Sequence, residues 1–123
     1  MSTRATYEFV DSFDTFTVYF HYDGYPSSAL EFINNSLSYS WTLPRFEACE
    51  FAAAFVAANK IGPGGVYYSK GKNSHADTQF HYTISLRDNN VWVKIENMYS
   101  GNIPDIIDED FLYLLLDRYA DNK

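Results

Sequence analysis

Cysteine and long apolar runs are scarce in this chain. One cysteine, Cys49, occurs in 123 residues, so no disulfide can form within the chain, and we expect a reducing, cytoplasmic compartment. No stretch approaches the ~18 consecutive apolar residues of a membrane span. Residues 1–8 carry an early acid and no apolar signal-peptide core. The sequence therefore predicts no contact with a membrane.

Positive charge is also in short supply. Nine Lys and Arg residues stand against sixteen Asp and Glu residues, which gives a formal net charge of −7. A surface of this sign repels phosphate backbones, so we expect no direct binding of nucleic acid. The same charge suits a protein partner that presents a basic surface.

Groupings of residues that carry out chemistry are sparse. Cys49 lies in an alanine-rich stretch, which is typical of a buried and inert thiol. Two His-x-Asp pairs, His21/Asp23 and His75/Asp77, could each place an imidazole beside a carboxylate, but a metal ion needs three or four converging ligands. We therefore expect no enzyme, no cofactor and no metal site, with a His/Asp metal-dependent enzyme as the remote alternative.

Aromatic residues, in contrast, are abundant. The chain is 46% hydrophobic and 19% aromatic, enough for one core in a single α+β domain that spans residues 1–123. Its eleven tyrosines exceed what such a core can hold with every hydroxyl paired. Some tyrosines should therefore be exposed, as they are at many protein–protein interfaces.

Hydrophobic periodicity predicts both strands and helices. Strands are expected at residues 6–10, 15–22, 66–68, 80–87 and 91–96, and helices at residues 26–37, 44–60 and 108–116. The order ββ-α-α-βββ-α predicts an α+β fold with a mainly antiparallel sheet of about five strands and two or three helices.

The segment His21-Tyr22-Asp23-Gly24-Tyr25-Pro26 predicts a sharp corner between a strand and a helix. Gly24 is expected to take the positive φ of a turn, and Pro26 has the fixed φ of a first helical residue. Ser28 and Glu31 have the spacing of a capping box.

Two groups of residues are candidates for binding a partner. Acids at the start of the last predicted helix exceed what helix capping requires, and they could pair with Lys and Arg in a groove that normally holds nucleic acid. Rings displayed at the corner could supply the buried anchors of an interface. The candidates are Asp105, Asp108, Glu109 and Asp110 at the acidic end, and Tyr19, Tyr25, His21 and Asp23 at the corner.

The corner also carries a family resemblance. Ser2-Thr3-Arg4-Ala5 before the first strand, followed by the His-x-Asp-Gly-Tyr-Pro segment, resembles a family of small phage and mobile-element proteins. The likeness covers the first forty residues and the helix predicted at 44–60. Ser27-Ser28 stands where the family pattern has Glu-Gly, so any role of an acid there does not carry over.

This resemblance implies a setting and a type of function. Small acidic phage proteins of this kind are similar in size, charge and lack of catalytic motifs to anti-CRISPR proteins. The likeness implies a non-enzymatic inhibitor in the host bacterial cytoplasm that binds a basic, nucleic-acid-binding surface of a Cas effector and blocks DNA binding or cleavage. The alternative is a self-associating phage scaffold or accessory domain. The target, the stoichiometry and the oligomeric state remain open.

Overall fold

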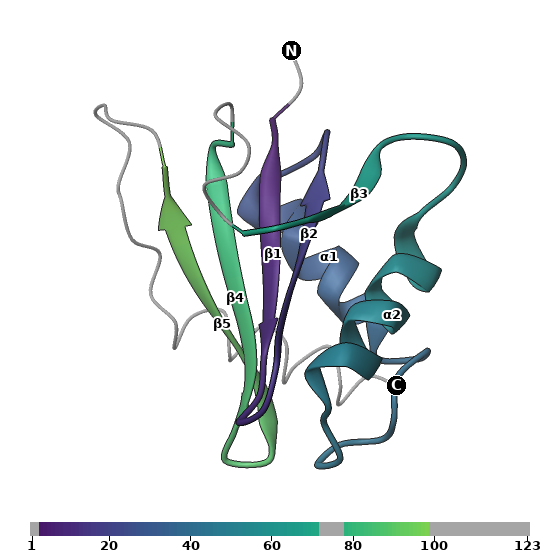
Figure 1. Cartoon of the computed structure of the whole chain (residues 1–123), viewed down its shortest axis with the longest axis vertical. Coiled ribbons are helices and arrows are strands. Elements are labelled where there is room, and N and C mark those ends of the chain that lie inside the picture. The colour runs from purple at the N-terminus through teal and green to yellow at the C-terminus, as the bar shows by residue number, and fades with distance from the viewer. Residues whose placement is uncertain (1–2, 72–77, 99–123) are drawn as a thin grey trace.

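A computed structural model describes residues 3–71 and 78–98 as a five-stranded sheet with two helices. The sheet has the strand order β3-β2-β1-β4-β5, which confirms the predicted α+β fold (Figure 1). In chain order the elements are β1 (Ala5–Val10), β2 (Thr15–Phe20), α1 (Pro26–Ser36), α2 (Ala48–Asn59), β3 (Val66–Ser69), β4 (Phe80–Arg87) and β5 (Asn90–Asn97). The helix predicted at 108–116 lies outside the described residues.

The sheet is mainly antiparallel, as predicted, but its centre is parallel. The pairs β1–β2, β2–β3 and β4–β5 are antiparallel, whereas β1 and β4 run parallel. Asp88 and Asn89, both with positive φ, form the two-residue turn of the predicted β4–β5 hairpin. The parallel pair could not be predicted because its strands are far apart in the chain.

The two helices cover one face of the sheet, and α1 lies behind β1 and β2 in Figure 1. Aromatic rings fill the space between these layers. The ring of Tyr7 lies 4.6 Å from that of Phe55 on α2 and 4.9 Å from that of Tyr82 on β4. All three side chains are fully buried. This helix-covered face is therefore the hydrophobic core.

The start of α1 agrees with the prediction, but its capping does not. Pro26 is the first helical residue, and the capping position belongs to Tyr25, which makes no side-chain capping hydrogen bond. Ser28 therefore already lies inside the first turn, so the predicted capping box with Glu31 is wrong.

Helix α2 begins at Ala48, later than the predicted start at Pro44. The Leu43–Pro44 peptide bond is cis, and Glu47 is still extended. A distant side chain caps the helix instead, since Asp11 Oδ2 accepts a hydrogen bond of 2.7 Å from the backbone N–H of Ala48. Among the described residues, no helix has the length and hydrophobicity needed to cross a membrane.

The face of the sheet opposite the helices is called here the polar face. It carries the alternate residues of each strand, whose side chains point away from the helices. Register places five such residues in one row across the sheet. In strand order they are Tyr67, Tyr19, Thr6, His81 and Glu96. The chain that leaves β3 passes in front of β2 and β1 on this side (Figure 1).

Candidate interaction surface

The corner at residues 21–26 is fastened to both neighbouring segments. The N–H of His21 donates to the carbonyl of Gly65 at 2.7 Å, and the N–H of Gly24 donates to that of Thr3 at 2.9 Å. The positive φ belongs to Asp23, at 54°, and not to Gly24 as predicted. Gly24 is needed for another reason, since a Cβ there would lie 2.9 Å from the carbonyl oxygen of Thr3.

Two buried tyrosines lie below this corner in the core. The hydroxyl of Tyr82 donates a short hydrogen bond to the carbonyl of Gly24, whereas that of Tyr7 has no partner among the described residues. Burial raises the pKa of both phenols, and for Tyr7 the nearby Tyr82 and Asp23 raise the pKa further. The corner is thus coupled to the core through one of the two phenols.

Of the two predicted anchor rings, the structure exposes only one. Tyr25 is 55% exposed, but Tyr19 is only 4% exposed, so the expectation that Tyr19 lies on the surface is wrong. The pleat does direct Tyr19 to the polar face, where its ring packs beside that of His21, 5.9 Å away. The Tyr19 ring lies 6.0 Å from that of Tyr67.

The polar residues of the corner, His21 and Asp23, are both exposed. Nδ1 of His21 lies 3.0 Å from the hydroxyl of Tyr19 and accepts a weak hydrogen bond of 3.4 Å from Nε of Arg4. No hydrogen bond joins His21 to Asp23 in the described structure. The corner therefore presents His21, Asp23 and Tyr25 to solvent as separate side chains.

The predicted acidic end cannot be located. Asp105, Asp108, Glu109 and Asp110 lie outside the described residues, as do His75 and Asp77. Within residues 3–71 and 78–98, no three His, Cys, Asp or Glu side chains converge as a metal site requires.

Cys49 differs from its prediction, because its side chain is exposed. The buried residues of α2 include Ala48, Phe51, Ala52 and Phe55, which recur at helical spacing along one side. Cys49 falls outside that stripe. The sequence did not indicate which side of the helix is buried, because alanines occur on both sides of it.

A buried polar chain on the polar face is a feature that the sequence did not predict. Thr6 Oγ1 lies 2.7 Å from Nδ1 of His81, and Nε2 of the same ring lies 2.8 Å from Glu8 Oε1. A hydroxyl, an imidazole and a carboxylate in this order resemble a nucleophile with its base and orienting group. Thr6 is 0% exposed, however, so no substrate can reach its hydroxyl. This buried polar chain of side chains is therefore structural, because its hydrogen bonds provide partners for buried polar groups.

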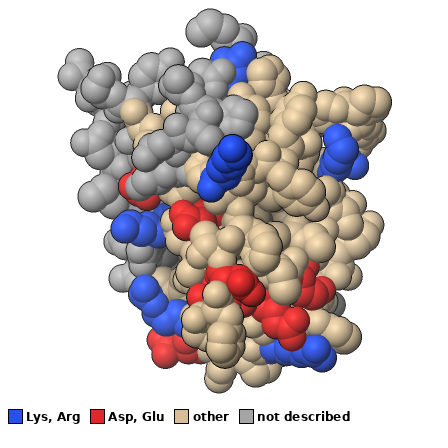
Figure 2. Space-filling model, viewed as in Figure 1, with Lys and Arg blue, Asp and Glu red and all other residues tan. Residues whose placement is uncertain are grey.

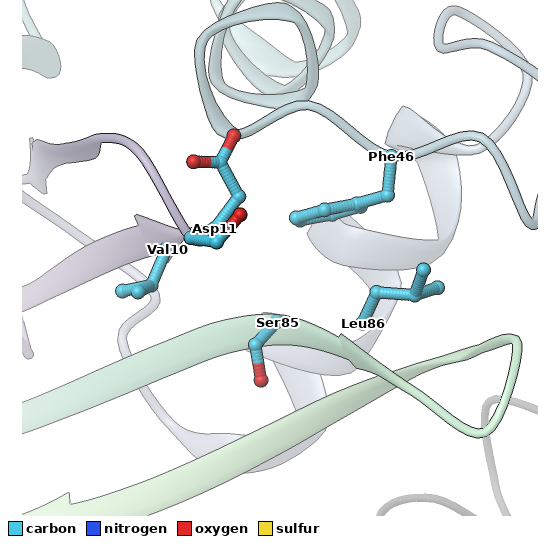
Figure 3. A pocket seen from close by; sticks show the side chains of 6 residues that line it. Val10, Asp11, Phe46, Ser85 and Leu86 are labelled. Atoms are coloured by element: carbon cyan, nitrogen blue, oxygen red, sulfur yellow. The ribbon is translucent and has the colours of Figure 1, made fainter.

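An open depression lies at the opposite end of the sheet from the corner. Its volume is about 390 Å³, and it is lined by Val10, Asp11, Ser12, Phe46, Ser85 and Leu86. Figure 3 shows the Phe46 ring pointing across the opening toward Asp11. The Asp11 carboxylate already accepts backbone hydrogen bonds from Ala48, Phe13 and Asp14, and these bonds lower its pKa. Asp11 therefore fastens α2 to the β1–β2 turn.

The edge strand β3 is a second feature that sequence reasoning missed, although its residues were predicted to form a strand. Two neighbouring rings on it are exposed, Tyr67 by 49% and Tyr68 by 80%, and Ile61 in the preceding loop is 88% exposed. Lys60 and Lys70 flank the strand. The two consecutive tyrosines do not by themselves predict exposed rings. Their exposure becomes clear only when β3 is known to lie at the edge of the sheet.

Charge is unevenly distributed over the face drawn in Figure 2. Acidic residues lie mostly in its lower half, where basic residues lie beside them near the rim, and further isolated basic patches occupy its upper half. Comparison with protein-family models, with curated proteins and with solved structures found no match. Exposed rings and charges are therefore the features of this surface that could recognise a partner.

Proposed function

We propose that this chain is a non-enzymatic protein that inhibits a host-defence complex by binding it, with a CRISPR–Cas effector as the partner. The observation that carries the proposal is the display of large rings to solvent at Tyr25, Tyr67 and Tyr68. Such rings bury much area at little cost in side-chain entropy, and tyrosine is enriched among the residues that dominate binding energy.

The chemistry of the described residues supports binding over catalysis. The one grouping there that has the composition of a nucleophile with its base includes the fully buried Thr6. Exposed His21 and Asp23 are not hydrogen-bonded to each other, and the Asp11 carboxylate is occupied by backbone N–H groups.

The net charge of −7 adds a second element to the proposal. Effectors that hold nucleic acid present grooves rich in Lys and Arg, and an acidic ligand gains both association rate and charge-assisted hydrogen bonds there. Asp105, Asp108, Glu109 and Asp110 are the acids proposed to make this contact.

A pull-down of candidate Cas effectors by the tagged full chain tests the proposal, at about 0.1 M and about 0.5 M salt. We expect capture of one effector, weakened at high salt because added ions screen the charges. Charge reversal at Asp108, Glu109 and Asp110 should weaken capture more than Glu31→Lys, a control on the exposed side of α1. Absence of capture at both salt concentrations would overturn the proposal.

A further inference from the structure

The edge of the sheet at β3 presents backbone groups that have no partner within residues 3–71 and 78–98. His21 and Gly65 form a hydrogen-bonded pair, and in an antiparallel ladder such pairs alternate with pairs whose N–H and C=O groups point apart. Along the register, Tyr19–Tyr67 and Thr17–Ser69 are then the hydrogen-bonded pairs. The N–H and C=O groups of Val66 and Tyr68 consequently point away from β2, where no described residue bonds to them.

This edge strand lacks two of the features that usually protect an exposed strand. The sequence Val66-Tyr67-Tyr68-Ser69 contains no proline and no charged residue. No other described strand lies beyond β3 in the sheet order. The exposed Tyr67 and Tyr68 rings stand on opposite faces of the strand, so each could cover side chains of an added strand.

Two lysines lie next to β3 in the chain, although the protein as a whole is acidic. Nζ of Lys60 donates to the carbonyls of Gly62 and Gly64, at 2.8 and 3.1 Å, which holds the ammonium group beside the start of the strand. Lys70 follows its last residue directly. Residues 51–71 contain no Asp or Glu. A cation therefore marks each end of the open edge.

We propose that β3 binds an extended, acidic segment of a partner protein, which joins the sheet as a strand beside Val66–Ser69. Backbone hydrogen bonds to Val66 and Tyr68 supply the attachment, and carboxylates near either end of the added strand pair with Lys60 and Lys70. The inference rests on the proposed binding function and names the chemistry of the segment that is bound.

A second copy of this chain fits the edge less well. Two-fold pairing centred on Tyr67 would place Lys70 of one copy opposite Gly64 of the other, whose carbonyl holds Lys60. Like charges would then meet at both ends of the interface, between two molecules that each carry a net charge of −7. An acidic strand would instead bring carboxylates to Lys60 and Lys70, so no like charges meet at the ends of the interface.

Titration of the ¹⁵N-labelled full chain with a capped Glu-Val-Glu-Val-Glu-Val peptide tests this proposal by NMR. We expect saturable shifts of the backbone amides of Val66–Lys70 and their neighbours on β2, and affinity lower by about tenfold when salt is raised to 0.5 M. The matched Lys-Val-Lys-Val-Lys-Val peptide should not bind. Equal binding of the two peptides, or shifts that avoid β3, would overturn the proposal.

Two variants at Tyr68 distinguish the contribution of backbone hydrogen bonds to peptide affinity from that of the side chain. Tyr68→Pro removes an N–H that points away from β2, so the sheet should survive while peptide affinity falls at least tenfold. Tyr68→Ala retains that N–H and should lose less affinity. Unchanged affinity in a folded Tyr68→Pro variant would contradict the proposed strand addition.

Lysine variants test the role of charge at this edge independently of the proline variant. Lys60→Gln combined with Lys70→Gln should weaken binding of the acidic peptide several-fold, whereas Lys94→Gln, on the opposite edge strand β5, should not. Equal effects of the two changes would indicate general attraction and overturn the site.

Results for the peptide and for the effector can be distinguished. Capture of a Cas effector that Tyr68→Pro leaves unchanged would overturn the β3 site but not the proposed function. Peptide binding at β3 without capture of any effector would support the site and contradict the host-defence partner. A concentration-dependent dimer that Tyr68→Pro abolishes would show that a second copy occupies the edge, which overturns the acidic partner.

Discussion

The two faces of the sheet are buried by different means. On the helix-covered face, rings such as Tyr7, Tyr82 and Phe55 contact one another, and the stabilisation is shared over many apolar contacts. On the polar face, burial includes the chain from Thr6 through His81 to Glu8, in which each group needs a particular partner. A core that is lined by rings should tolerate changes of similar volume, whereas a buried polar chain should not tolerate the loss of one member.

Replacement of His81 should have the largest effect. In His81→Leu the buried hydroxyl of Thr6 and the half-buried carboxylate of Glu8 both lose a partner. We expect the free energy of unfolding to fall by about 1–3 kcal/mol, as measured by urea denaturation. Thr83→Val, one pleat along the same face, should change the free energy by no more than about 0.5 kcal/mol. A His81→Leu variant as stable as the parent would contradict the contrast between the faces.

The two core tyrosines give a sharper test within the helix-covered face. Tyr82→Phe removes the donor to the buried carbonyl of Gly24, and we expect a loss of about 1 kcal/mol in the free energy of unfolding. Tyr7→Phe removes a buried hydroxyl that has no partner among the described residues, so it should be neutral or stabilising. Equal losses in the free energy of unfolding for Tyr82→Phe and Tyr7→Phe would contradict this expectation. They would show that the hydrogen bond to Gly24 adds no stability beyond the effect of removing a buried hydroxyl.

Asp11, which joins the β1–β2 turn to α2, should show an effect that depends on pH. Asp11→Asn should lower Tm by about 2–8 °C at pH 7, in the range for loss of one helix cap. Backbone hydrogen bonds from Ala48, Phe13 and Asp14 lower the pKa of this carboxyl, so it stabilises the fold above the ordinary aspartate pKa of about 3.9. That contribution is lost as the pH falls through the lower, folded-state pKa.

Calorimetric scans between pH 7 and pH 2 should therefore show that the difference in Tm between the parent protein and Asp11→Asn becomes smaller as the pH falls. Asp14→Asn is the matched control, since it removes a neighbouring charge whose carboxylate accepts no hydrogen bond from a described residue. A gap for Asp11→Asn that stays constant over this range would show that the carboxylate charge is not what holds α2.

Local patterns were sufficient to predict most of the elements. Alternation predicted the strands, and Pro26 marked the start of α1. Boundaries were missed where a distant residue intervenes, as at α2, where Asp11 supplies the cap for Ala48. A contact between residues 37 positions apart leaves no periodic signal in the sequence.

Of the candidate surface, the corner and Tyr25 were predicted, whereas burial of Tyr19 and exposure of Cys49 were not. The face to which a strand residue points follows from pleat parity, but its exposure depends on which strands flank it. Tyr19 and Tyr67 point the same way from adjacent strands, yet Tyr19 on internal β2 is buried and Tyr67 on edge strand β3 is about half exposed.

The sequence by itself determined composition, charge, the order of the helices and strands and the side of each strand that is apolar, because these follow from residue chemistry and local periodicity. Only the tertiary structure decided that β1 and β4 pair in parallel, that Thr6, His81 and Glu8 meet, and that β3 is left at the edge. Those outcomes depend on how distant segments pack around one core, where burial of rings outweighs the preference of any single segment.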